Sequence, residues 1–120
     1  MSQISPRTPP ILDPPIRLAV CVSGGGSTLQ NLLDRMASGS LRAQVTRVIA
    51  SRPGIGAIER AERAGVPVSV VTRKGQDVAT FSRDVFQAAR AGEADLVILG
   101  GFLSLIQIPQ DFVGRVVNVH

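Results

Sequence analysis

Short apolar runs alternate with amphipathic segments along most of this chain, and the alternation limits its fold more than any other feature. Runs of four to six mainly aliphatic residues, typical of buried strands, occur at 17–22, 45–50, 68–71, 96–100 and 116–119. Apolar residues at helical spacing lie between them, at 27–37, 55–64 and 77–91. Strands that alternate with such helices form a parallel sheet through right-handed crossovers. The sequence therefore predicts an α/β fold, a Rossmann-like parallel sheet with helices on both faces.

The rest of the chain's organisation is simple. Its 120 residues are enough for one domain with a single core. Five of the eight prolines fall within the first fifteen residues, which excludes a helix or a central strand there. We therefore expect residues 1–16 to be a flexible tail and residues 17–120 to be the folded unit.

Composition also limits the cellular context and the metal chemistry. No apolar run approaches the ~20 residues of a membrane-spanning helix, and the first residues lack the pattern of a secretory signal. One cysteine, Cys21, and one histidine, His120, allow neither an internal disulfide nor a zinc site. We therefore expect a cytoplasmic protein without a metal. Because Cys21 lies inside an apolar run, it is expected to be an inert core residue.

The charge of the chain is basic. Thirteen Lys and Arg residues stand against nine Asp and Glu, a formal net charge of +4. Basic proteins can bind nucleic-acid phosphates non-specifically, but these arginines are scattered and no Trp or Tyr provides a stacking surface. A small anionic substrate explains the charge at least as well, so we expect neither a nucleic-acid nor a membrane partner.

Three consecutive glycines separate the first predicted strand from the first predicted helix. Glycine accepts a positive φ and leaves amide N–H groups accessible, and a helix N-terminus adds unpaired N–H groups and a partial positive charge. Together they predict a phosphate site in the loop at 23–28. An ordinary N-cap turn is the alternative, although it requires fewer glycines. The loop lacks the third glycine of a dinucleotide fingerprint and the lysine of a triphosphate loop, which favours a phosphomonoester.

Other candidates follow the fourth and fifth predicted strands, because parallel sheets bind ligands at the carboxyl ends of their strands. After Gly101, the apolar residues 102–106 either line the core or form the wall of a slot for a flat heterocycle. Asn118 and His120 share one face of the last strand, since strand residues alternate. An amide and an imidazole there suit oxyanion stabilisation and proton transfer; two polar residues at a solvated terminus are the alternative.

A basic group, Arg73, Lys74 and Arg83, lies near the start of the third predicted helix. A solvated helix face is the ordinary explanation of such a group. Recognition of a carboxylate on a ligand is the alternative.

Four blocks of residues carry a family resemblance: VSGGGSTLQ at 22–30, RAERAGVP at 60–67, GFL at 101–103 and GRVVNVH at 114–120. Over residues 17–120 the chain resembles phosphoribosylglycinamide formyltransferases, the folate-dependent enzymes of purine synthesis. The first block is quite specific to this family. The Asn-x-His block is shared with other formyltransferases and with deformylases that use the same folate.

The resemblance implies a fold of the formyltransferase type and formyl transfer from 10-formyltetrahydrofolate to the amine of 5-phosphoribosylglycinamide, through a tetrahedral intermediate and without a metal. It implies that Gly26, Ser27 and Thr28 hold the phosphate of the ribonucleotide. Asn118 would contact the formyl group and His120 would carry the proton. The same resemblance implies a folate site formed by Arg83, Leu103, Ser104, Leu105, Ile106 and Asn118.

The chain departs from this family in three places. Ser104 replaces a usual arginine, Arg52 replaces a usual asparagine, and the sequence stops at His120, where similar proteins continue with Pro-Ser-Leu-Leu, further strands and an aspartate that sets the protonation of the histidine. We therefore expect the N-terminal half of a formyltransferase domain, truncated after the fifth strand, with little or no turnover alone. Formation of a homodimer stays open. The alternative functions are another folate-dependent formyl hydrolase or transferase, and a non-catalytic module that binds a phosphometabolite.

Overall fold

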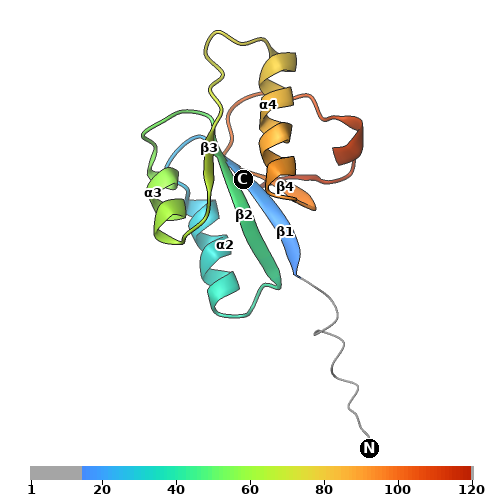
Figure 1. The fold of residues 1–120 in the computed structure, drawn as a ribbon. Coiled ribbons are helices and arrows are strands. Elements are labelled where there is room, and N and C mark those ends of the chain that lie inside the picture. The colour runs from blue at the N-terminus through green and yellow to red at the C-terminus, as the bar shows by residue number, and fades with distance from the viewer. Residues whose placement is uncertain (1–14, 120) are drawn as a thin grey trace, which may run out of the picture.

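The structure, a computed structural model, describes residues 15–119. Its strands form one parallel sheet in the order β3-β2-β1-β4-β5 (Figure 1). Their bounds are β1 (Ile16–Val22), β2 (Ala43–Ala50), β3 (Val68–Val70), β4 (Leu96–Gly100) and β5 (Val116–Val119). The chain first builds outward from β1 to β3 and then returns to add β4 on the other side of β1. The predicted parallel sheet is confirmed, and its topological switch point lies between β1 and β4.

Helices cover both faces of the sheet (Figure 1). On one face, α2 (Ser27–Ala37) and α3 (Gly56–Arg63) bury Leu29, Ala57 and Ala61 against the even-numbered residues of β1. On the other face, α4 (Val78–Ala91) buries Phe81, Val85, Phe86 and Ala89. Because both faces of β1 are covered, residues 18–22 are all buried, as expected for a central parallel strand.

The burial of β1 also settles the state of Cys21. Its side chain is fully buried, and burial raises the pKa of the thiol to about 12, because a thiolate would lose its hydration there. The thiol is therefore an unreactive core group at neutral pH, as the sequence predicts.

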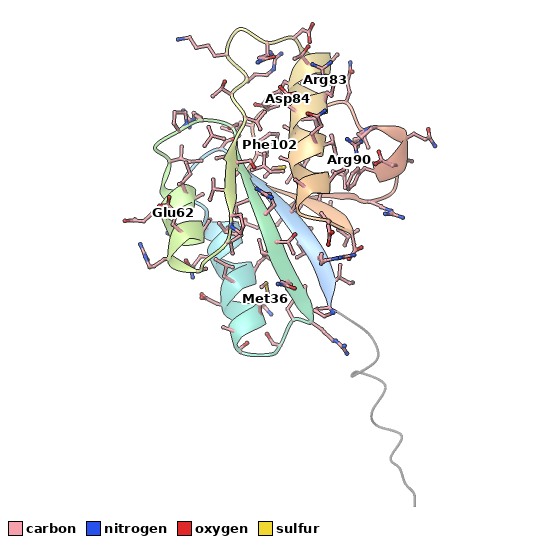
Figure 2. The ribbon with its side chains drawn as sticks, viewed as in Figure 1. Met36, Glu62, Arg83, Asp84, Arg90 and Phe102 are labelled. Carbon is pink, nitrogen blue, oxygen red and sulfur yellow. The ribbon has the colours of Figure 1, made fainter. Side chains whose placement is uncertain are left out.

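The connection from β4 to β5 contains no crossover helix within the described residues. A short 3₁₀ helix, η1 (Gln110–Phe112), places Phe112 on Phe86 of α4, with ring centroids 5.1 Å apart. Arg90 of α4, which Figure 2 labels, donates two hydrogen bonds of 2.8 Å to the carboxylate of Asp111. These contacts anchor the segment before β5, and so they position the last strand and Asn118.

Two sequence expectations concern residues at the ends of the chain. The predicted tail, residues 1–16, lies outside the described residues except for Pro15 and Ile16, and Ile16 already pairs with Ala43 as part of β1. His120 also lies outside the described residues. Within residues 15–119, no helix has the length and apolar character needed to cross a membrane.

Candidate active site

Loops at the carboxyl edge of the sheet enclose an open cleft of about 440 Å³. The loops follow β1, β2, β3 and β4, so the cleft lies at the edge where the topology predicts a ligand. It is lined by two buried serines, three cations, and small or apolar residues: Ser23, Ser51, Arg52, Pro53, Thr72, Arg73, Lys74, Leu103 and Ser104.

A buried pair of serines joins three of these loops. The hydroxyls of Ser23 and Ser51 are 2.8 Å apart, and the amide of Leu103 donates to Ser23 Oγ at 3.0 Å. Both serines are less than a tenth exposed, so each hydrogen bond replaces one that water would otherwise make. The pair therefore fixes the loop after β4 above the ends of β1 and β2.

The glycine loop, Gly24 to Gly26, connects β1 to α2, and its last residue has the positive φ that the sequence predicts. Gly26 is the N-cap of α2 with φ +84°, and the described residues provide no side-chain cap. A Cβ at Gly26 would lie 2.7 Å from the Cβ of Ala57, so both the backbone angle and the approach of α3 require glycine. A Cβ at Gly24 or Gly25 would meet no described atom within 4 Å. The loop is therefore packed at its base and open at its tip.

Carbonyl oxygens of the glycine loop are engaged by donors from its α3 side. Arg60 Nε donates to Gly25 O at 2.7 Å, and the amide of Ala57 donates to Gly24 O at 3.1 Å. Arg52 donates to Ser23 O through both Nε and Nη2, at 3.2 and 2.8 Å. Because these oxygens are engaged, an anion at the N-terminus of α2 meets less negative potential.

The three predicted phosphate-binding residues lie together at this N-terminus. Ser27 is exposed, while Thr28 is half-buried. A Cβ at Gly100 would lie 3.1 Å from Thr28 Cγ2, so the end of β4 packs directly against the start of α2. The structure thus brings the glycine loop and the β4 loop to one place, although no described contact tests phosphate binding itself.

Residues 102–106 alternate between the core and the cleft edge. Phe102, which Figure 2 labels, stacks on Phe81 of α4, with ring centroids 6.0 Å apart and ring planes 8° from parallel. Ile106 packs into the same core. Leu103 and Leu105 point outward with 83% and 79% of their surface exposed, and Ser104 lines the cleft. The core-lining alternative therefore applies to Phe102 and Ile106, whereas a slot for a flat heterocycle at residues 103–105 stays a prediction.

Asn118 and Arg83 are not among the described residues that line the cleft. Asn118 is exposed on β5, paired in register with Leu99 of β4. Arg83 lies on α4, its side chain 64% exposed and 3.9 Å from Asp84 (Figure 2). It borders a different hollow of about 240 Å³, between α4 and residues 107–109. The roles of Asn118 and Arg83 stay predictions, as does that of His120.

Sequence reasoning missed Ser23, Ser51 and Arg60 as functional residues, and noted Arg52 only as an unexplained departure. Single serines and arginines carry no periodic signal, and each acts through a contact distant in sequence. The one usable signal was position, because Ser23 and Ser51 directly follow predicted strands.

Comparison with known proteins decides the family. The formyl transferase family matches residues 16–120. The chain belongs to the formyl transferase family. This membership agrees with the resemblance drawn from the four sequence blocks.

Two named relatives match most of this chain. It is 38% identical over 113 residues to the trifunctional purine biosynthetic protein adenosine-3 of Drosophila melanogaster, covering 87% of this chain and 8% of the relative. It is 29% identical over 112 residues to phosphoribosylglycinamide formyltransferase of Haemophilus influenzae, covering 87% of this chain and 50% of the relative. The chain therefore spans half the length of that bacterial relative and a small part of the insect protein.

A solved structure gives the same result for the fold. Glycinamide ribonucleotide transformylase 1 from Symbiobacterium toebii superimposes with a TM-score of 0.81 at 33% identity, covering 88% of this chain and 51% of the other. The sheet and helices described above therefore match about half of the fold of that transformylase.

Proposed function

We propose that this formyl transferase chain takes part in the transfer of a formyl group from 10-formyltetrahydrofolate to the amine of glycinamide ribonucleotide, in purine synthesis. The names of its relatives support this proposal. The observation that carries it in the structure is the glycine loop, where Gly26 in the left-handed region opens α2 beside a cleft. A phosphomonoester and a reactive amine on one small molecule fit this arrangement.

The N-terminus of α2 is the proposed site of the ribonucleotide phosphate. Amides at the start of a helix bind phosphate without a cationic side chain, and the hydroxyls of Ser27 and Thr28 add two further donors. Since a Cβ at Gly26 would strike Ala57, that backbone bend requires glycine at this position. The exposed tip of the loop leaves space for three phosphate oxygens.

The segment after β4 is the proposed folate site. The folate supplies the formyl group when it is bound. The exposed apolar side chains of Leu103 and Leu105 suit a flat ring, and Ser104 in the adjoining cleft offers a hydroxyl. The residues present therefore fit this ligand. Arg83 and Ile106 stay proposed members of the site because of the family resemblance.

Asn118 and His120 are the proposed reaction groups. As the amine attacks the formyl carbon, negative charge grows on the formyl oxygen, and a side-chain amide such as that of Asn118 can donate to it. The attacking amine must also lose a proton, which the imidazole of His120 would accept near neutral pH and pass to N10 of the folate. The bond between the formyl carbon and N10 then breaks, and tetrahydrofolate leaves. Asn118 is exposed at the carboxyl end of β5, where such a contact requires it. We also propose small-molecule partners, because the basic residues are scattered rather than massed, and a cytoplasmic location, where proteins without disulfides are usual.

Calorimetric titration with two ligands tests the proposed function. The chain is titrated with glycinamide ribonucleotide and, separately, with a non-reactive analogue of 10-formyltetrahydrofolate. Binding of both supports formyl transfer to the ribonucleotide. Binding of the folate alone would instead indicate a folate-dependent relative without that substrate, and binding of neither would indicate a non-catalytic module.

A further inference from the structure

The short strand β5 specifies its own alignment with β4 only weakly. Its sequence is VVNV, and Asn118 pairs in register with Leu99 of β4. Val116 packs into the core on the α4 side of the sheet, and Val119 packs into the core on the other side. A shift of one residue along β4 would turn every side chain of β5 to the opposite face, and Val117 would then fill the place of Val116. The contacts that fix this register therefore lie outside the strand.

The segment before β5 is anchored to α4 by one aromatic ring and one ion pair. The ring of Phe112 is buried, and its centroid lies 5.1 Å from that of Phe86. The guanidinium of Arg90 lies 5.7 Å from the centroid of the Phe112 ring, and it donates to Asp111 through both Nε and Nη2 at 2.8 Å. Bidentate pairs of this kind fix geometry as well as charge. Arg90 therefore contacts two consecutive residues of η1 at once.

A tight turn connects this anchor to the start of β5. The amide of Arg115 donates to Phe112 O at 2.9 Å. Between them, Val113 has φ −60° and ψ 127°, and Gly114 has φ +79°. These angles and this hydrogen bond define a type II turn, whose third residue takes the left-handed backbone of glycine. Arg115 O then accepts from the amide of Val97 in β4 at 2.9 Å, so the buried ring and a bond to β4 are joined by a turn of fixed geometry.

We propose that Arg90 and Asp111 are positioning residues for formyl transfer, because their ion pair fixes the register of β5 and thereby the face on which Asn118 lies. This inference rests on the proposed function, in which the side-chain amide of Asn118 donates to the formyl oxygen. A one-residue shift of β5 would turn that amide to the opposite face of the sheet. Neither Arg90 nor Asp111 is among the described residues that line the cleft, so the pair acts on the reaction through β5.

Two folate analogues that differ only at the formyl oxygen test this inference on the full chain. One non-reactive analogue carries a carbonyl at the formyl position, the other carries a methylene group there, and calorimetry measures both affinities. One hydrogen bond from Asn118 should make the carbonyl analogue bind about fivefold more tightly. In Arg90→Gln and in Asp111→Ala, this affinity ratio should fall toward one, while the affinity for the methylene analogue stays within about twofold. A role in stability alone would not change the ratio.

Three further variants serve as controls for the affinity ratio. Asn118→Ala should bring the ratio to one directly, because it removes the donor. Asp111→Glu keeps a carboxylate for the guanidinium and should leave the ratio unchanged. Arg63→Gln removes an exposed cation that pairs with Glu59 on α3, far from β5 in the sheet order, and should change neither affinity.

Hydrogen exchange at the amide of Val97 measures the attachment of β5 without any ligand. The acceptor of this amide is Arg115 O, so a β5 that is released from η1 should leave the amide open to solvent more often. We expect exchange to be about tenfold faster in Asp111→Ala than in the unmodified chain, and unchanged in Arg63→Gln. Circular dichroism checks that each variant keeps the overall fold.

The outcomes separate this inference from the proposed function. If Asn118→Ala abolishes the ratio but Asp111→Ala leaves it unchanged, or weakens both analogues equally, the positioning role is wrong and the proposed function stands. If the ratio is one in the unmodified chain, or if neither analogue binds, the proposed function fails, and the link between the ion pair and formyl transfer fails with it. Exchange at Val97 then judges the register alone: faster exchange in Asp111→Ala supports it, and unchanged exchange overturns it.

Discussion

Replacement of Gly26 by alanine is the sharpest test of how the glycine loop is built. Gly26 has φ +84°, a region that costs an L-residue roughly 1–2 kcal/mol. The new Cβ would lie 2.7 Å from the Cβ and 2.9 Å from the Cα of Ala57, so α3 has to move. Such overpacking typically costs about 1–3 kcal/mol. Gly26→Ala is therefore expected to lower the free energy of unfolding by about 2–5 kcal/mol.

Urea unfolding followed by circular dichroism measures this loss as a lower midpoint with an unchanged slope. Gly25→Ala is the matched control, because a Cβ there meets no described atom within 4 Å and no left-handed φ is involved; its stability should stay within about 0.5 kcal/mol. In a double-mutant cycle, Gly26→Ala should cost less in an Ala57→Gly background, because the 2.7 Å contact with the Cβ is gone while the 2.9 Å contact with the Cα remains. Equal urea midpoints for the two single variants would refute the packing argument.

Three further predictions concern the loops and the cap of α4. Ser51→Ala removes the hydroxyl partner of Ser23 and should cost about 1–2 kcal/mol, with faster hydrogen exchange at the Leu103 amide; unchanged exchange would contradict the proposed tie between the loops. Arg60→Met leaves Gly25 O without its 2.7 Å donor and should weaken glycinamide ribonucleotide binding about tenfold. Unchanged binding would indicate that Arg60 is only an exposed polar residue of α3. The pKa of Asp77 is lowered in the fold, mainly because its carboxylate accepts a hydrogen bond from the amide of Thr80 at the cap of α4. The carboxylate therefore contributes its full stability above its unfolded pKa of ~4 and loses that contribution as pH falls through the lower folded pKa. The fall in Tm between about pH 5 and pH 2 should be smaller in Asp77→Asn, and identical Tm profiles for the two proteins would contradict this role.

The elements of the fold were predictable because each strand is mainly apolar and each helix has one apolar face. The observed ends of strands and helices differ from the predicted ends where strand pairing or helix capping sets the end of the element. β2 begins at Ala43, since that residue pairs with Ile16, and α4 begins at Val78, since Asp77 is its cap. η1 was not predicted, because three residues after Pro109 carry no periodicity.

The candidate site was predictable only where backbone chemistry is encoded locally. Three glycines before a helix indicate an open loop from sequence alone, and Gly26 has the predicted left-handed backbone. The contacts that hold this loop, from Ser51 and Arg60, join residues about thirty positions apart in the chain. Such pairs follow from the strand order, which no single segment contains. The cluster of Arg52 with Arg73 likewise becomes visible only when β2 and β3 lie side by side.

The central claim is that the amides at the start of α2 bind the phosphate of the substrate, and comparison of glycinamide ribonucleotide with its dephosphorylated nucleoside tests it most directly. Calorimetry measures the affinity of the chain for each ligand, and the amide chemical shifts of the ¹⁵N-labelled chain show which residues each ligand contacts. The account predicts that removal of the phosphate weakens binding by about a hundredfold, or ~2.7 kcal/mol, and that the ribonucleotide shifts the amides of residues 24–28. Equal affinity for the two ligands, or shifts confined to other loops, would contradict it.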